Sequence, residues 1–172
     1  MNQTIKDLLE RRSIRAFETR QVSDGDLKTV LEVGTYAPTA ANRQSPIMIA
    51  VQNADDIAAM SRLNAAVMGR DSDPFYGAPT VIVVFAQKDV FYSIKDASLV
   101  MGNLMNAAHA IGLGSCWINR AYEVFEKEEG KALLKKWGIH GSYVGIGNCI
   151  LGYPAEAPAM KPRKENGVYY VL

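Results

Sequence analysis

The chain has 172 residues, which is enough for one domain, and its 48% hydrophobic and 22% charged residues match an ordinary soluble protein. A formal net charge of +1 argues against a protein that binds nucleic acid or a membrane surface through its overall charge, so any basic site must be local. No apolar run approaches the roughly 18 residues that span a bilayer, and no secretory signal is recognised, so we expect a cytoplasmic protein.

Helical and strand-like patterns alternate along the chain, and no repeat or linker divides it, so we expect a single domain over residues 1–172. In chain order the patterns predict a helix at 4–12, a helix from Ser23 to Ala37–Pro38, a strand at 47–51, a helix from about 55 to 68, a strand at 80–86, a helix at 96–111, a strand at 115–118, a helix around 126–137 and strands at 143–151 and 168–172. Ser23 is the expected N-cap of its helix, and the continuously apolar stretch 80–86 is typical of a strand buried on both faces. The alternation favours layers of helices and strands and leaves the strand directions open.

The cysteines and histidines do not stand at the spacing of a redox pair or a metal site. Cys116 and Cys149 each lie in an apolar stretch, and we interpret them as buried thiols. His109 and His140 stand alone, so no metal site is predicted. The sequence also offers no pair of carboxylates and no Ser/His/Asp set with a claim to catalysis.

Four residues at the predicted end of the first helix form the strongest candidate site. Helical spacing directs Arg11 and Arg15 to one side, with Arg12 and Ser13 between them. Cations at a helix C-terminus complement the helix dipole, which is the simpler interpretation of this cluster. Guanidinium and hydroxyl groups are also the usual ligands of phosphate, so a phosphorylated ligand is the alternative, and both remain open.

A second basic group, Lys161 to Lys164, stands far along the chain in a proline-biased segment, where a solvated loop is the simpler interpretation. If Lys161 and Arg163 converge with the first cluster, each charge-assisted hydrogen bond would contribute about 1.5–3 kcal/mol to holding a phosphate. The polar loop 37–46 and the glycine-bounded stretch 112–119 are weaker candidates, which a connection and a core strand explain equally well. The sequence contains neither a dinucleotide-binding fingerprint nor a P-loop.

Several motifs follow one another in order along nearly the whole chain. They are Arg11-Arg12-Ser13-Ile14-Arg15-Ala16-Phe17, Ala37-Pro38-Thr39 through Gln44, Gly77-Ala78-Pro79, Asp96, Gly112 through Trp117, Gly152-Tyr153-Pro154 and Lys161-Pro162-Arg163. In this order they resemble the FMN-dependent nitroreductase family, and the first motif is the most specific. The resemblance implies an α+β fold, namely a three-layer α/β/α sandwich with a mixed, mainly antiparallel sheet. It also implies an intertwined homodimer with two FMN molecules at the subunit interface.

The resemblance further implies that each FMN site uses both chains. One subunit would contact the flavin through Arg11, Arg12, Ser13 and Arg15, with Arg15 at the N1–O2 edge of the ring. Lys161 and Arg163 would close on the phosphate, and the other subunit would supply Pro38, Thr39, Ala40 and Asn42. The strand residues Trp117, Ile118 and Asn119 would pass near the isoalloxazine edge through backbone groups. The terminal segment 168–172 would pair with the partner's sheet.

The implied reaction is ping-pong. NADH or NADPH gives a hydride to the flavin and leaves, and a nitroaromatic, quinone or similar small acceptor then takes the electrons in the same space. FMN carries the chemistry, so no catalytic side chain is expected. The same scaffold supports flavin-dependent reductive dehalogenation or flavin binding with little turnover, which remain the alternatives. The chain departs from the family's pattern at Gln44-Ser45-Pro46, where many members have Gln-Pro-Trp.

Overall fold

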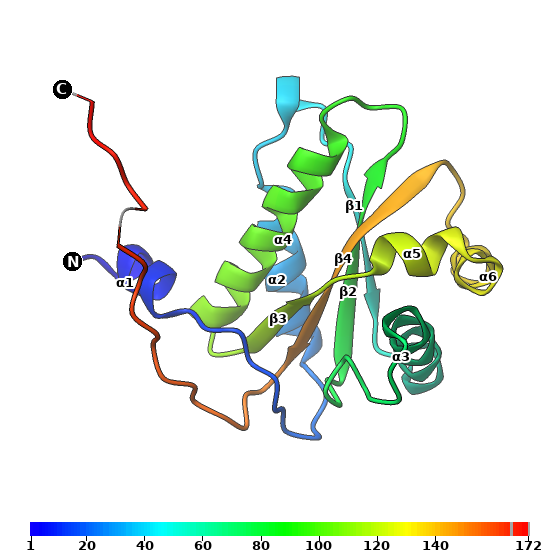
Figure 1. Ribbon diagram of the computed structural model, residues 1–172, viewed down its shortest axis with the longest axis horizontal. Helices are drawn as coiled ribbons and strands as arrows, with labels where there is room; N and C mark the ends of the chain where they lie inside the picture. Colours follow the sequence, from blue (N-terminus) through cyan, green and yellow to red (C-terminus); the bar gives the residue numbers. More distant parts are fainter. Residues whose placement is uncertain (166, 172) are drawn as a thin grey trace.

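The computed structural model describes residues 1–165 and 167–171. These residues form a four-stranded sheet in the order β1-β2-β4-β3, in which every neighbouring pair of strands is antiparallel. The strands are β1 (Ile47–Val51), β2 (Thr80–Gln87), β3 (Gly114–Ile118) and β4 (Tyr143–Gly152). The helices are α1 (Gln3–Glu10), α2 (Asp24–Thr35), α3 (Ala54–Met68), α4 (Ser93–Ala110), α5 (Ala121–Glu126) and α6 (Glu128–Lys136), with a short 3-10 helix η1 (Ala40–Asn42). Helices α2 and α4 cover one face of the sheet and α3, α5 and α6 cover the other, which confirms the predicted three-layer sandwich (Figure 1).

Strand β2 lies in the middle of the sheet and contributes to a hydrophobic core on each face. Val81, Val83 and Phe85 pack in the core beneath α3, α5 and α6, whereas Ile82 and Val84 pack in the core beneath α2 and α4. All five side chains are fully buried. Successive side chains of a strand point to opposite faces, so a strand covered on both sides must be apolar at every position.

Helix α6 confirms the helix expected around 126–137, whereas the short helix α5 that precedes it was not predicted. Between them Lys127 is extended, with φ −77° and ψ 155°, and the chain folds back so that α6 packs against α5. Gly130 permits this contact, because a Cβ atom at that position would lie 2.1 Å from the carbonyl oxygen of Val124. No helix within the described ranges, 1–165 and 167–171, is long and apolar enough to cross a membrane.

The strand expected at 168–172 is wrong for the residues that the structure describes. Val168 to Val171 adopt no regular structure, and their exposed fractions lie between 70% and 99%. Leu172 lies outside the described residues. A strand exists only through pairing with a neighbour, and the tail of this single chain leads away from the sheet (Figure 1).

The segment that follows α1 runs along the outer edge of β3. Ser13 forms an isolated parallel bridge with Ser115, and the N–H of Ile14 donates to the carbonyl oxygen of Ser115 at 3.0 Å. Gly114 allows the close approach, since a Cβ atom there would lie 2.9 Å from the side chain of Ile14. This backbone pairing covers part of an open sheet edge and fixes where the arginine motif lies.

Both cysteines are free and buried, which confirms their interpretation as buried thiols. They lie on the neighbouring strands β3 and β4, but Cys116 belongs to one core and Cys149 to the other. Burial raises the pKa of the Cys149 thiol to about 12. A thiol in this environment is a packing group rather than a nucleophile.

Candidate functional site

The two basic groups of the sequence meet in the folded chain. A cavity of about 290 Å³ is lined by Arg11, Arg12, Ser13, Arg15, Pro158, Ala159, Lys161 and Arg163. The convergence that sequence reasoning could state only as a condition is therefore present. None of the ion pairs formed by residues 1–165 and 167–171 includes any of the five cations of this cavity. Five positive side chains around one small hollow make it an anion site on electrostatic grounds.

Arg12 and Arg11 have different roles, although they are neighbours. The Arg12 guanidinium donates to the carbonyl oxygens of Leu9 and Arg11, both at 2.8 Å, and so satisfies the end of α1. For Arg12 the helix-terminus interpretation is therefore correct. Arg11 is the C-cap residue of α1, but its Nη1 atom is buried without a hydrogen-bond partner among the described residues and is available for a ligand.

The unpartnered Nη1 of Arg11 tests whether a phosphate fits this cavity. A buried guanidinium nitrogen that donates to nothing costs free energy, which an anion with several acceptor oxygens would recover. Ser13 adds a hydroxyl donor at the same wall, and Lys161 and Arg163 add cations from the opposite segment. The donor set therefore suits a phosphate group.

One carboxylate moderates this positive charge. The side chain of Glu156 accepts a hydrogen bond from the backbone N–H of Arg15. Glu156 also lines an adjoining cavity of about 390 Å³, which shares Arg12 and Pro158 with the first and reaches His109 near the end of α4. Sequence reasoning missed Glu156, because no pattern around it links it to a segment so far away in the chain.

The loop Pro38–Asn42 does not reach this cavity in the single chain. Its η1 turn lies at the beginning of α4, where the N–H of Ala40 donates to Asp96, whereas the cavity lies near the other end of the helix (Figure 1). Asp96 and His109 are 13 residues apart in α4, which corresponds to about 20 Å along the helix axis at 1.5 Å per residue. Pro38, Thr39, Ala40 and Asn42 are therefore not brought together with the arginines within one chain.

Trp117, Ile118 and Asn119 lie at the end of β3, beyond the pairing with Ser13. The indole of Trp117 packs over Gly147, where a Cβ atom would lie 2.5 Å from Nε1. The carbonyl oxygens of Ile118 and Asn119 face the interior, where both accept from Nδ2 of Asn148 at 3.3 and 3.4 Å.

A second side-chain amide holds the same turn. Nδ2 of the fully buried Asn64 donates to the carbonyl oxygen of Asn119 at 2.8 Å. The next residue, Arg120, adopts a left-handed conformation with φ 75°, which L-residues disfavour. Sequence reasoning missed this amide support, because its members come from α3 and β4 and share no local motif.

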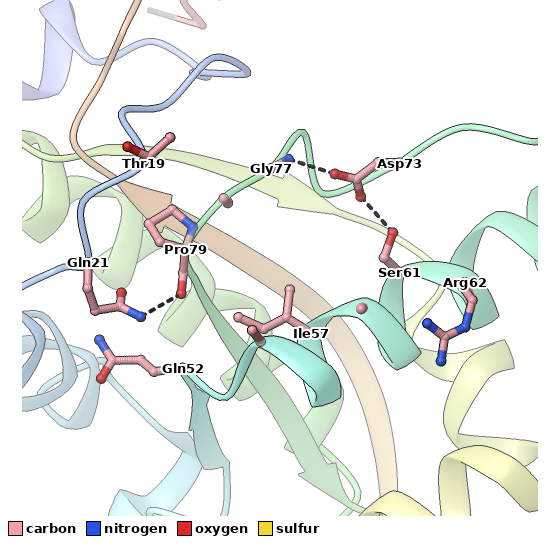
Figure 2. Close-up of a pocket in the computed structure, with 12 residues that line it drawn as sticks. Thr19, Gln21, Gln52, Ile57, Ser61, Arg62, Asp73, Gly77 and Pro79 are labelled. Atoms are coloured by element: carbon pink, nitrogen blue, oxygen red, sulfur yellow. Dashed lines mark hydrogen bonds between the residues drawn. The ribbon is translucent and has the colours of Figure 1, made fainter.

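A larger cavity, of about 600 Å³, lies elsewhere and contains none of the predicted site residues. Figure 2 shows its polar groups largely bonded to one another: Gln21 Nε2 donates to the Pro79 carbonyl oxygen at 3.0 Å, and Asp73 accepts from the Ser61 hydroxyl and the Gly77 N–H, both at 2.6 Å. These groups organise the loop before β2. This cavity is larger than the arginine cavity, but several of its polar groups are paired with one another, whereas Nη1 of Arg11 in the arginine cavity has no partner among the described residues.

Comparison with known proteins identifies the family of this chain. The family model described as the nitroreductase family matches residues 8–70 and 68–153. The chain belongs to the nitroreductase family. It is 32% identical over 162 residues to an Archaeoglobus fulgidus protein assigned provisionally as an NADH dehydrogenase/NAD(P)H nitroreductase, with 91% of this chain and 88% of that protein covered. It is 24% identical to the FMN reductase [NAD(P)H] of Bacillus subtilis, with 95% of this chain and 70% of that protein covered.

Solved structures show the same nitroreductase fold. A nitroreductase with bound FMN from Bacteroides fragilis superimposes with a TM-score of 0.90, at 26% identity and with 100% of both chains covered. An FMN-dependent nitroreductase from Clostridium difficile matches with a TM-score of 0.80, at 26% identity, over 99% of this chain and 98% of that one. The nitroreductase architecture expected from the ordered motifs is thereby confirmed.

Proposed function

We propose that this nitroreductase-family chain is an FMN-dependent oxidoreductase that takes electrons from NADH or NADPH and passes them to a nitroaromatic, quinone or similar small acceptor by a ping-pong mechanism. The observation that carries the proposal is the arginine cavity, whose buried Arg11 Nη1 has no partner among the described residues. The relatives named as an FMN reductase and as nitroreductases with FMN support the same cofactor.

When bound, FMN supplies the hydride and electron transfer, and the protein supplies binding, orientation and charge. Arg11, Ser13, Lys161 and Arg163 would donate to the phosphate, and Arg12, whose Nη1 is engaged at the end of α1, would add positive charge and its remaining N–H groups. Arg15 would place a fixed positive charge at the N1–O2 edge of the ring, where negative charge develops on reduction. Because the five basic groups bind and orient, the proposal needs no general acid or base.

A homodimer would complete the site. Each chain holds its own Pro38–Asn42 loop at the opposite end of α4 from its own arginine cavity, with about 20 Å of helix between Asp96 and His109. A second chain is therefore needed to bring Pro38, Thr39, Ala40 and Asn42 to the flavin. The apolar side chains Ile5, Leu8 and Leu9 of α1 are 45–54% exposed, which supports an uncovered interface.

The C-terminal tail supports the same assembly. Its exposed segment from Val168 to Val171 is β-branched and aromatic, and β1 has an unpaired edge in the sheet order of the single chain. Pairing between this tail and the sheet of the partner would cover both. The ends of β3, Trp117, Ile118 and Asn119, would then border the ring, through their backbone N–H groups because the carbonyl oxygens of Ile118 and Asn119 are already engaged.

The test is a visible absorbance spectrum of the purified protein, followed by stopped-flow reduction with NADH and with NADPH. We expect a bound flavin that either nicotinamide bleaches and that a quinone or nitroaromatic reoxidises, with parallel lines in double-reciprocal plots. A colourless protein that does not take up added FMN would refute the cofactor assignment. Bleaching without reoxidation by any of these acceptors would refute the acceptor class but not the cofactor.

A further inference from the structure

Asp96 is a buried acidic residue that holds the loop Pro38–Asn42 in place. It lies in the first turn of α4, and only 4% of its surface is exposed. The backbone N–H of Ala40 donates to both carboxylate oxygens, at 3.1 Å to Oδ1 and 3.2 Å to Oδ2. Within residues 1–165 and 167–171 no ion pair includes Asp96. Burying a carboxylate costs free energy unless it is hydrogen-bonded, and the bonds from the Ala40 N–H offset part of that cost. We therefore interpret Asp96 as a residue that stabilises the loop.

The loop needs such an anchor, because its backbone is strained. Ala41, Asn42 and Gln44 have φ values of 53°, 52° and 49°, in the left-handed region that residues other than glycine disfavour. Its internal hydrogen bonds join Gln44 to Thr39 and to Asn42, at 3.0 and 2.9 Å. These bonds close the loop on itself, and the two bonds to Asp96 attach it to α4. Without that attachment the strained conformation would compete with relaxed ones.

We propose that Asp96 is a positioning residue that acts across the dimer interface: it fixes the loop of its own chain for the FMN site of the partner chain. This inference rests on the proposed function. It follows from the helix length, because about 20 Å of α4, from Asp96 to His109, lies between the loop that Asp96 holds and the end of the helix near the arginine cavity of the same chain. Asp96 therefore influences an FMN molecule that is bound by the arginines of the partner chain and not by those of its own chain.

The first experiment compares FMN affinity among substitutions at one position. Asp96→Ala removes both hydrogen bonds and is expected to weaken FMN binding about ten- to hundredfold, whereas Asp96→Asn keeps one acceptor oxygen and is expected to weaken it less. Asp55→Asn is the matched control, because Asp55 is an exposed acidic residue in the first turn of α3 that lines no part of the proposed site. Affinities are measured by quenching of flavin fluorescence on the intact dimer, with near-UV circular dichroism as the check of folding.

The second experiment separates action across the interface from action within one chain. Two differently tagged chains, one carrying Asp96→Ala and the other Arg11→Ala with Arg15→Ala, are expressed together, and the mixed dimer is isolated through both tags. If Asp96 acts on the partner's site, one site of the mixed dimer is intact, so half of the FMN binds with the affinity of the unmodified protein. If Asp96 acts on its own chain's site, both sites are impaired, which would overturn the inference.

The outcomes distinguish this inference from the proposed function. An unmodified protein that binds no FMN would refute the proposed function and this inference with it. If the unmodified protein binds FMN and both Asp96→Asn and Asp96→Ala bind it with the affinity of the unmodified protein, only the role of Asp96 is refuted. A graded loss in the two variants, together with recovery of half the sites in the mixed dimer, is the result we expect.

Discussion

Replacing Arg11 with alanine is expected to weaken FMN binding while leaving riboflavin binding unchanged. Arg11 is the cation of the cavity whose Nη1 is buried and unpartnered among the described residues, so a phosphate would gain a desolvated, charge-assisted hydrogen bond there. Such a bond contributes about 1.5–3 kcal/mol, which corresponds to an increase of about 10- to 150-fold in the Kd of FMN. Riboflavin lacks the phosphate and should not detect the change.

Arg163 provides a graded comparison at the same site. It lines the cavity but is exposed, so water and salt screen its charge, and we assign it at most about 1 kcal/mol, or roughly a fivefold change in Kd. The expected order of FMN affinities is therefore unmodified protein, then Arg163→Ala, then Arg11→Ala. Because Nη1 of Arg11 has no hydrogen-bond partner among the described residues, removing this side chain should not lower the thermal stability of the apoprotein.

The assay is titration of the apoprotein with FMN and with riboflavin, followed through flavin fluorescence at two salt concentrations. Arg62→Ala is the matched control, since Arg62 is an exposed arginine that lines only the cavities away from the candidate site. An equal loss of FMN and riboflavin affinity in Arg11→Ala would show that Arg11 does not bind the phosphate. Unchanged FMN affinity in that variant would reject the cavity as the phosphate site.

Three further predictions concern the scaffold. Hydrogen bonding from Lys136 lowers the pKa of the buried Asp56 from its ordinary value of 3.8, so the stability that Asp56 contributes is complete above about pH 4 and is lost as the pH falls through its folded pKa. Asp56→Asn should lower the free energy of unfolding by about 1–3 kcal/mol at pH 7. In urea unfolding measured at a series of pH values, the variant should lose less stability at acidic pH than the unmodified protein. The buried Cys149 thiol, with its pKa raised to about 12, should resist alkylation at pH 8 until the protein unfolds, and rapid labelling of the native protein, read by mass spectrometry, would contradict its burial. Gly114→Ala should displace Ile14 from the β3 edge, because the new Cβ atom would lie 2.9 Å from that side chain. The variant should therefore bind FMN more weakly in the same titration, with a smaller effect on riboflavin. If the variant and the unmodified protein bind FMN with equal affinity, this placement of the arginine motif is contradicted.

Local patterns predicted the elements whose own residues determine them. Strand β2 is apolar throughout because both of its faces are covered, and that requirement is visible in a single stretch of sequence. The start of α2 is visible for a similar reason, since Ser23 accepts from the N–H of Asp26, as an N-cap residue does. Such features depend on neighbours within a few residues.

The features that sequence could not provide depend on distant contacts. The short helix α5 was not predicted, because its place is set by packing against β4 and α6 rather than by a local pattern. The tail from Val168 to Val171 has the composition of a strand but no partner within the chain, so composition alone misled. The resemblance to the nitroreductase family, rather than any pattern, is what associated that tail with a second subunit.

The arginine motif shows the same division within five residues. Its sequence suggested either helix-terminus cations or phosphate ligands, and the structure assigns Arg12 to the first role and leaves Arg11 available for the second. Spacing could not separate them, because the distinction depends on where the chain turns after Glu10. That turn is set by the pairing of Ser13 with Ser115, a residue of a distant strand.

This pairing also explains how the fold tolerates several uncompensated cations in one place. The backbone of the motif is held at the sheet edge by the bond from Ile14 to Ser115, so its position does not rely on attraction between side chains. Repulsion among the guanidinium groups therefore lowers the stability of the folded protein, and the pairing of the motif with the sheet offsets this loss. An anion entering the cavity removes that cost, so its binding free energy includes the relief of repulsion as well as the new hydrogen bonds. We therefore expect a phosphate to bind without moving the backbone of the arginine motif, because the bond from Ile14 to Ser115 holds that backbone before the ligand arrives.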